Sequence, residues 1–232
     1  TASTASTAAA AAAPVSTEPQ RIVTISGVTE YQLPNGLRVL LSQDRSQPTV
    51  TMNLVYQVGS RHEGAGEAGM VHLLEHMLFK GTAATPDPKR EFSQRGMRWN
   101  ATTSYDRTNY FARFNRDTDD ATWLLGWFAD TMTNVRIDAE KLDSERPVVR
   151  NEMQASENRP QQLLFQQLMA IAYDFHPYGR PVIGTVSDLE LVRPYRLQMF
   201  YERFYRPDNA VLIVTGNFDE AETMALVAAT LG

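Results

Sequence analysis

The amino-acid sequence predicts an α+β domain in which helices pack on one face of a mostly antiparallel sheet. Segments of strand composition are joined by short turns, and several longer segments carry apolar residues at helical spacing. An order of helices and hairpin-connected strands is typical of this layered arrangement. With 232 residues, 43% of them hydrophobic, the chain is long enough for one substantial core, so we expect one domain at residues 21–232.

The strands are predicted from composition and from the turn residues between them. Pro34-Asn35-Gly36 forms a hairpin turn between the first two strands, and a polar turn joins the fourth and fifth. We expect strands at residues 22–32, 37–42, 49–58, 98–104, 108–114 and 209–215.

Helices are predicted where apolar residues recur at helical spacing. Pro147 lacks a backbone N–H, so it should kink or restart the helix that contains it. Proline and glycine predict a loop at residues 177–181. We expect helices at residues 70–79, 88–94, 119–134, 138–158, 161–173, 194–204 and 219–231.

Residues 1–20 differ from the rest of the chain, because they are rich in Ala, Ser and Thr. This composition predicts a disordered tail. Its six consecutive alanines are far fewer than the about 20 apolar residues that span a bilayer, so we expect no membrane span. The chain lacks an initial Met and a long apolar leader, which is compatible with a processed periplasmic or secreted bacterial protein. A net charge of −5 argues against a nucleic-acid partner.

The most informative segment is His72-Leu73-Leu74-Glu75-His76. Side chains four residues apart on a helix lie about 5–6 Å apart between Cβ atoms, so the two imidazoles are spaced to bind one metal ion. Glu75 lies on the same edge of the helix, beside any open coordination position. The pattern is the inverted zinc-hydrolase motif H-x-x-E-H.

The neighbours of this motif bear on the alternative, in which the histidines are ordinary surface or hydrogen-bonded core residues. The helix is apolar almost all round, which predicts that it is buried. Unpaired ionisable groups cost several kcal/mol each when buried, and a divalent cation is one partner that removes this cost. The apolar neighbours are Met70, Val71, Leu73, Leu74, Met77, Leu78 and Phe79.

A metal ion held by two imidazoles needs a third protein ligand, which must be His or a carboxylate because the chain has no cysteine. His62 and His176 are candidates, but each lies in a segment that is typical of a loop. Glu152 is the stronger candidate, since Val148 and Val149 one turn before it and Ala155 one turn after it indicate that its carboxylate emerges from an apolar helix face.

Glu145 shares the helix face of Glu152 but lies two turns away, about 10.5 Å along the axis. That separation is too large for both carboxylates to bind one ion comfortably, so one is expected to be a ligand and the other to support the site. The alternative for Glu152 is a buried ion pair with Arg146 or Arg150.

Several separated motifs together resemble the signature of the M16 (pitrilysin) metallopeptidases, which include mitochondrial processing peptidase and insulin-degrading enzyme. They are Gly59-Ser60-Arg61-His62-Glu63, the helix with His72, Glu75 and His76, and Phe79-Lys80-Gly81-Thr82. The 75 residues between His76 and Glu152 match the family's spacing to its distal glutamate, and the resemblance extends over residues 22–232. S-ribosylhomocysteine lyases share the helix motif but use a Cys ligand, which this chain lacks.

The resemblance implies a site and a fold. It implies Zn²⁺ held by His72, His76 and Glu152, with Glu145 supporting the site as in the processing-peptidase branch. It also implies the M16 domain fold and an exposed substrate-binding edge strand that contains Asn100, Ala101 and Thr102. An edge strand accepts an extended peptide by main-chain hydrogen bonds; the alternative for this segment is an ordinary sheet strand.

The ligand set predicts amide hydrolysis without a covalent intermediate. Two His and one Glu leave a fourth position for water, whose pKa zinc lowers to about 7. Glu75 then has the role of general base. The sequence contains neither Gly-x-Ser-x-Gly nor a thiol that would supply a different nucleophile.

Two functions follow as hypotheses. The first is a zinc endopeptidase that cleaves short or unfolded peptides, and the second is a non-catalytic assembly or scaffold subunit, a role that some M16 members have adopted. M16 enzymes resemble two or more copies of this domain around a chamber. The sequence shows one copy, so we expect a second M16 domain or a homologous subunit as the partner that full activity needs.

Overall fold

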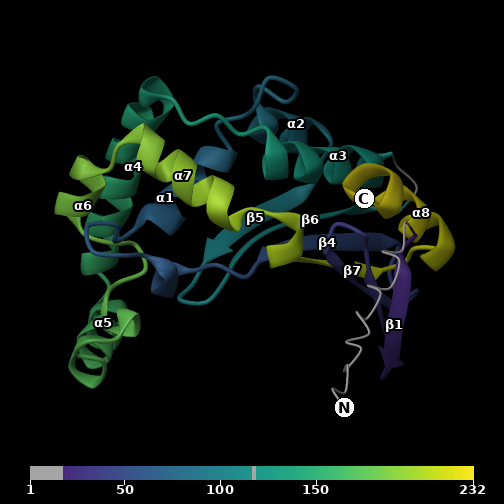
Figure 1. The fold of residues 1–232 in the computed structure, drawn as a ribbon, viewed down its shortest axis with the longest axis horizontal. Helices are drawn as coiled ribbons and strands as arrows, with labels where there is room; N and C mark the ends of the chain where they lie inside the picture. The colour runs from purple at the N-terminus through teal and green to yellow at the C-terminus, as the bar shows by residue number, and fades with distance from the viewer. Residues whose placement is uncertain (1–17, 117–118) are drawn as a thin grey trace, which may run out of the picture.

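The computed structural model describes residues 18–116 and 119–232. The predicted tail, residues 1–20, lies almost wholly outside them. Within the described part, seven strands form one sheet in the order β1-β2-β3-β7-β4-β6-β5 (Figure 1). The strands are β1 Gln20–Ile25, β2 Val28–Gln32, β3 Arg38–Gln43, β4 Thr49–Tyr56, β5 Arg98–Thr103, β6 Thr108–Asn115 and β7 Ala210–Gly216.

Helices account for most of the remaining described chain. Three short 3-10 turns, Ser60–His62, Pro177–Gly179 and Pro207–Asn209, lie in the connections. No helix in the described residues is both long and apolar enough to cross a membrane. The α-helices are α1 Met70–Leu78, α2 Pro88–Gln94, α3 Asp120–Thr133, α4 Ala139–Glu157, α5 Pro160–Ala172, α6 Val186–Leu191, α7 Pro194–Phe204 and α8 Glu220–Leu231.

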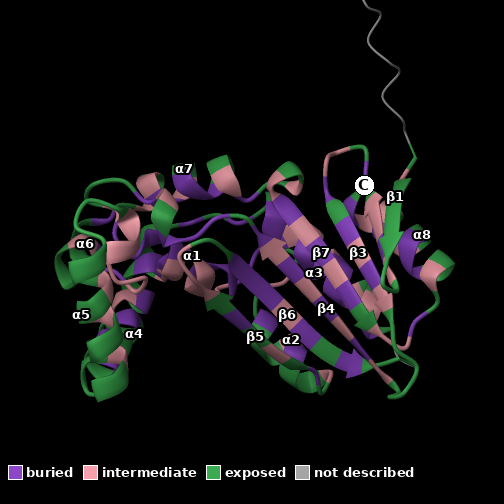
Figure 2. Cartoon of the chain, turned by 90° about the horizontal axis from the view of Figure 1, so that it is seen from below, coloured by how far each residue is buried: buried purple, intermediate pink, exposed green. Residues whose placement is uncertain are grey.

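The α+β prediction is confirmed. The only parallel pair in the described sheet joins β3 to β7, and every other neighbouring pair is antiparallel. Helices α2, α3 and α8 cover one face of the sheet, whereas no helix of residues 18–116 and 119–232 lies on the other face (Figure 2). The alternation of buried and half-buried residues along β4 reflects this difference between the faces.

Two elements differ from the sequence prediction. Residues 22–32 are not one strand but parts of β1 and β2, joined by Ser26 and Gly27, which have φ of 50° and 80°. Positive φ at both central positions is the geometry of a tight hairpin turn, which glycine permits at no steric cost. Helix α6 was not predicted; it is short, and the side chain of Thr185 caps it by accepting from the backbone N–H of Asp188.

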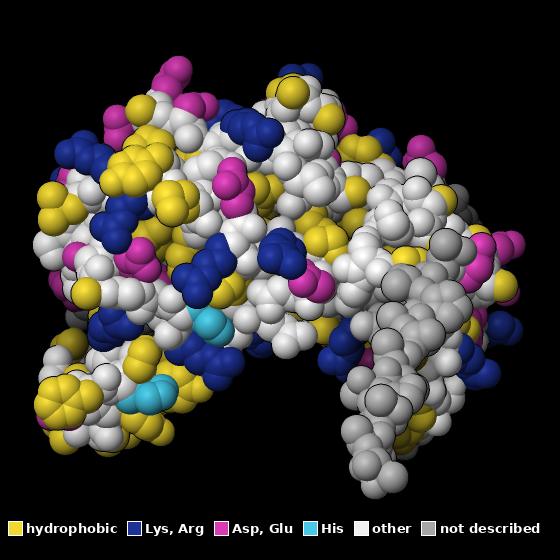
Figure 3. Space-filling view, in the orientation of Figure 1, with side chains coloured by type: hydrophobic (Ala, Val, Ile, Leu, Met, Phe, Trp, Pro, Cys, Tyr) yellow, Lys and Arg dark blue, Asp and Glu magenta, His cyan; other side chains and the backbone are white. Residues whose placement is uncertain are grey.

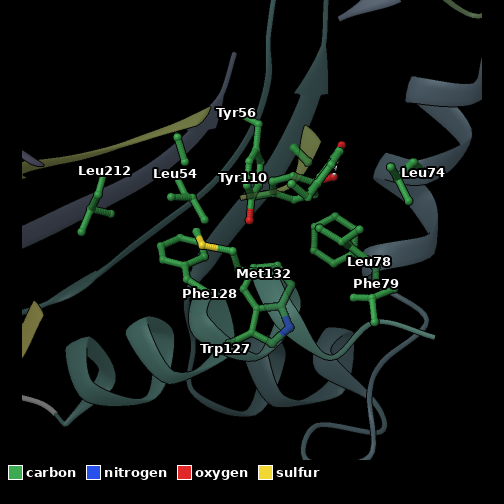
Figure 4. Close-up of a cluster of buried hydrophobic side chains, with 14 of the residues drawn as sticks. Leu54, Tyr56, Leu74, Leu78, Phe79, Tyr110, Trp127, Phe128, Met132 and Leu212 are labelled. Atoms are coloured by element: carbon green, nitrogen blue, oxygen red, sulfur yellow. Dashed lines mark hydrogen bonds between the residues drawn. The ribbon is translucent and has the colours of Figure 1, made fainter. Parts of the chain in front are cut away.

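The hydrophobic core lies between the helix-covered face of the sheet and the helices α1 and α3 (Figure 4). Leu54 from β4, Leu74 from α1 and Phe128 from α3 are completely buried in it. Burial of a side chain of this size contributes about 1.5–3 kcal/mol. The core therefore fixes α1 against the sheet along the helix face opposite its polar residues.

The N-terminal end of α1 is held by a close backbone approach. Gly69, the N-cap residue, has φ of 90°, and a Cβ atom there would lie 2.5 Å from the carbonyl oxygen of Ile183. The buried carboxylate of Glu63 accepts hydrogen bonds from the backbone N–H groups of Gly69 and Val71. These contacts fix the start of the helix and hence the direction of the side chains on its first turn.

Helix α4 packs against α1 and runs without interruption through Pro147. Of the two effects expected at this proline, a kink or a restart of the helix, the restart is therefore wrong. Pro147 leaves the carbonyl of Asp143 without its usual helical donor, but both residues are exposed, so water can satisfy that carbonyl. Glu145 and Glu152 consequently project from one continuous helix.

Candidate metal centre

Three side chains from two helices bring their ligand atoms together. His72 and His76 come from α1 and Glu152 from α4, and one ligand atom of each lies within 4.8 Å of the others. Oε2 of Glu152 lies 3.6 Å from Nε2 of His72 and 3.4 Å from Nε2 of His76. Two ligands of a tetrahedral zinc ion, each about 2.0–2.1 Å from the metal, lie about 3.3 Å apart, so these residues fit Zn²⁺.

The electrostatics of His72 also fit a metal ligand. Burial, together with the neighbouring His76, lowers the pKa of His72 to about 4. Its imidazole is therefore neutral at pH 7 and offers a lone pair. Its buried Nδ1 has no hydrogen-bond partner among the described residues.

Neither the alternative ion pair of Glu152 nor the alternative histidine ligands are found at this site. Arg146 bonds to Asp143 and to backbone carbonyls, and Arg150 pairs with Glu190, so neither arginine pairs with Glu152. His62 and His176 are not part of the ligand group: His62 bonds to Gly59, and His176 accepts from the backbone of Tyr178.

Glu152 is more exposed than its apolar neighbours suggested. Its side chain is 46% exposed, whereas that of Glu145 is only 3% exposed. The reason is that Val148 also points to solvent, while Val149 and Met153 carry the buried face of α4. The ligand group thus lies at the edge of the helix pair, open on the side of Glu152.

Glu145 lies behind His76, on the side away from Glu152. Nδ1 of His76 donates to Oε1 of Glu145 at 2.8 Å, and Nζ of Lys80 lies 2.5 Å from the other carboxylate oxygen. Burial raises the pKa of Glu145, but the hydrogen bonds from His76 and Lys80 outweigh it and lower the pKa to about 2. The ionised carboxylate therefore fixes the His76 ring with Nε2 directed toward Glu152.

We expect Glu145→Gln to weaken zinc binding about 10- to 100-fold, because an amide holds the imidazole less firmly and lowers its basicity. Competition with a fluorescent zinc chelator would measure the affinity. Glu140→Gln, on the exposed first turn of the same helix, serves as the matched control. Unchanged zinc affinity in Glu145→Gln would show that this contact does not support the site.

Glu75 lies between the ligand group and strand β5. Its Oε2 accepts a hydrogen bond of 2.6 Å from the hydroxyl of Thr103, the last residue of β5. Burial raises the pKa of Glu75, although the Thr103 bond and the neighbouring His76 lower it. A carboxylate with a raised pKa is a stronger base than an ordinary one, so Glu75, on the same helix as the two histidines, is suited to accept a proton and pass it on.

Strand β5 is a terminal strand of the sheet, so one of its edges is unpaired. Asn100 and Thr102 are exposed on the face without helices, and Ala101 is buried on the other face. The hydroxyl of Thr102 donates to Oδ1 of Asn109 on β6. One end of the free edge, at Thr103, is therefore hydrogen-bonded to Glu75, and the edge extends away from Glu75 toward Arg98.

Sequence reasoning missed two contacts at this site. Thr103 was read as a strand residue, and Lys80 only as a part of a motif. No periodicity reveals that a hydroxyl at the end of a strand meets Glu75, because the contact joins elements 28 positions apart. The position of Lys80 four residues after His76, one helical turn, was the only available signal.

The fold and this ligand group together define a domain of the metallopeptidase class. Comparison with known protein families makes the assignment specific: the chain belongs to peptidase family M16. Residues 38–186 match the model described as insulinase (peptidase family M16), and residues 192–232 match the M16 inactive domain. The family's metal is zinc, in agreement with the names of the relatives.

Individual relatives support the same assignment. An uncharacterized zinc protease of Mycobacterium leprae is 34% identical over 89% of this chain and 46% of its own length. The mitochondrial-processing peptidase beta subunit of Blastocladiella emersonii is 28% identical over 96% of this chain and 48% of its length. The first half of the periplasmic protease PqqL from Escherichia coli superposes with a TM-score of 0.84 and 27% identity, over 91% of this chain and 47% of that one. The chain thus spans slightly less than half the length of the curated relatives.

Proposed function

We propose that the chain is the zinc-binding half of an endopeptidase that hydrolyses short or unfolded peptides. The observation that carries this proposal is the convergence of His72, His76 and Glu152 within 4.8 Å, with the half-buried Glu75 on the same helix as the two histidines. A bound zinc ion would lower the pKa of a water molecule to about 7 and polarise the scissile carbonyl.

The chain's own residues supply the remaining parts of the mechanism. Glu75 takes the proton from the attacking water and passes it to the leaving amine. Thr103 donates to Glu75 and so holds the carboxylate in one orientation. Glu145 performs the corresponding role for His76, whose ring it fixes through Nδ1.

The unpaired edge of β5 supports a binding mode for the peptide. A peptide can add there as a further strand, parallel or antiparallel, by pairing with the main chain of Asn100, Ala101 and Thr102. Such a peptide passes Glu75 at the Thr103 end of β5. Main-chain pairing requires an extended segment, so a folded protein would not be accepted. Short and unfolded peptides are the class of substrate that this edge fits.

A second M16 domain or a homologous subunit is the partner that we propose for full activity. Helix α5 has no buried residue, and its apolar side chains point to solvent in Figure 3. Ile171 is 81% exposed and the following Phe175 is 98% exposed. Apolar surface of this extent is typical of an interaction site. A second half, present in relatives of about twice this length, would cover it and help to enclose the peptide.

The alternative is a non-catalytic assembly or scaffold subunit. Exposure of α5 is compatible with that role as well, since a scaffold also needs an interface. The partly desolvated carboxylate of Glu75 favours the enzyme, because a scaffold gains nothing from removing an ionisable group from water. For the compartment we propose the periplasm, on the ground that the similar PqqL is described as a periplasmic protease.

Cleavage of a quenched fluorescent peptide tests the proposal. The zinc-loaded chain should cleave an unstructured peptide of about ten residues slowly, and addition of a polypeptide with a second M16 half should raise the rate. A tightly folded protein should stay intact under the same conditions. No cleavage with zinc and both halves present would contradict the enzyme, and robust turnover by the chain alone, shown to be monomeric, would contradict the need for a partner.

A further inference from the structure

Two arginines lie directly opposite each other at the start of the free edge strand. Arg98 of β5 pairs with Arg113 of β6 in the antiparallel register, so both side chains point to the same face of the sheet. Both are exposed, and Arg113 lies between the buried Ala112 and Phe114 of β6, so the two arginines lie on the face opposite the core. Directly opposed side chains have Cβ atoms about 4.5–5.5 Å apart, and like charges at this spacing destabilise the strand pair.

No carboxylate offsets this repulsion in the part of the chain that the structure describes. Neither Arg98 nor Arg113 takes part in an ion pair there. Arg113 donates from Nε and Nη2 to the hydroxyl of Thr49, at 3.1 and 2.9 Å, whereas the neighbouring Arg95 is the arginine that pairs with Asp119 and Asp120. The two guanidinium groups are therefore available to an external anion.

Both arginines line a shallow groove of about 590 Å³. Asn100 and Phe111, the next cross-strand pair on the same face of the sheet, line it as well. Two guanidinium groups with an aromatic ring beside them suit a carboxylate on a short aliphatic stem, because the carboxylate can accept charge-assisted hydrogen bonds while its methylene groups contact the ring.

The register relates this groove to the metal centre. Arg98 is the first residue of β5 and Thr103, which contacts Glu75, is the last. At about 3.3–3.4 Å per residue, the two ends lie about 17 Å apart, and an extended peptide along the edge advances at the same rate. A peptide side chain near Arg98 thus lies about five residues from the bond next to Glu75.

We propose that Arg98 and Arg113 form a subsite that selects an acidic side chain of the peptide, about five residues from the cleaved bond. This inference rests on the proposed function in one respect, namely that the peptide lies along β5. A strand edge by itself recognises only the main chain of a peptide. The subsite would add a preference for one type of side chain.

Binding without turnover tests the subsite separately from the peptidase activity. The zinc-loaded Glu75→Gln variant would be titrated, by fluorescence anisotropy, into labelled unstructured peptides with amidated C-termini that carry one Glu or one Gln at successive positions. We expect one Glu position to bind about three- to ten-fold more tightly than its Gln counterpart, with the difference falling at high salt. Mass spectrometry of peptides cut by the unmodified chain would place that Glu about five residues from the cleaved bond.

Variants then assign the preference to the arginine pair. Arg98→Gln and Arg113→Gln should each reduce the Glu preference, whereas Arg90→Gln, which alters an exposed residue of α2 on the other side of the sheet, should keep it. Arg98→Glu should reverse the preference, so that a peptide with Lys at the same position binds more tightly. A Glu preference that persists in the Arg98→Gln, Arg113→Gln double variant would overturn the proposal. So would a preference that appears only with a free C-terminal carboxylate. Peptide binding without cleavage would count against the proposed function and leave the subsite standing.

Discussion

Replacing Glu75 with Gln is expected to lower the rate of peptide hydrolysis by about 10²- to 10⁴-fold while zinc content stays near one ion per chain. The amide keeps the size of the side chain and can still contact the Thr103 hydroxyl, but it cannot take a proton from water. His72, His76 and Glu152 are unaltered, so the metal group should remain intact. Initial rates on a quenched peptide, together with metal analysis of the same sample, measure both quantities.

Glu157→Gln is the matched control for this substitution, since Glu157 is an exposed residue at the end of α4. It should change neither rate nor metal content. If the unmodified chain and Glu75→Gln hydrolyse the peptide equally, Glu75 is not the base, and the assembly or scaffold role becomes the better account. Loss of zinc in Glu75→Gln would instead mean that the variant disturbs the ligand group.

Loss of a ligand should have the larger effect on metal binding. We expect His76→Ala to lower zinc affinity by more than about 100-fold and to remove activity with it, because two ligands and an open site hold zinc poorly. Glu152→Gln should do the same, since a neutral amide oxygen is a much weaker ligand than a carboxylate. Isothermal titration with zinc, followed by rate measurements at saturating zinc, separates the two effects.

His62→Ala is the matched control here, because His62 lies outside the ligand group. Its zinc affinity should equal that of the unmodified chain. The predicted ligand set would be wrong if Glu152→Gln retained full zinc affinity, or if His62→Ala lost it. Circular dichroism of each variant would show whether the fold is retained, since α1 is buried and His76→Ala removes a side chain that contacts Glu145.

The sequence predicted those parts of the structure that depend on local spacing. Imidazoles at positions i and i+4 of a helix must converge, so His72 and His76 could be paired before the fold was known. Helical rise also showed that Glu145 and Glu152 could not both reach one ion comfortably. The Ser26-Gly27 turn is a local signal as well, but the strand composition on both sides of it favours one continuous strand.

Contacts between distant elements were beyond such reasoning. The exposure of Glu152 differs from the sequence expectation, since it depends on how α4 packs on α1 and not on the apolar residues near the carboxylate. The contact of Lys80 with Glu145 arises only when α4 packs against α1, and that of Thr103 with Glu75 only when β5 meets α1. The pairing of Arg98 with Arg113 likewise requires the strand register, which composition does not fix.

The most direct test of the account is a crystal structure of the zinc-loaded chain with anomalous data at the zinc edge. The account predicts one strong peak about 2.0–2.2 Å from Nε2 of His72, Nε2 of His76 and a carboxylate oxygen of Glu152. A zinc ion bound elsewhere, or Glu152 turned away with no other carboxylate or imidazole in its place, would contradict it.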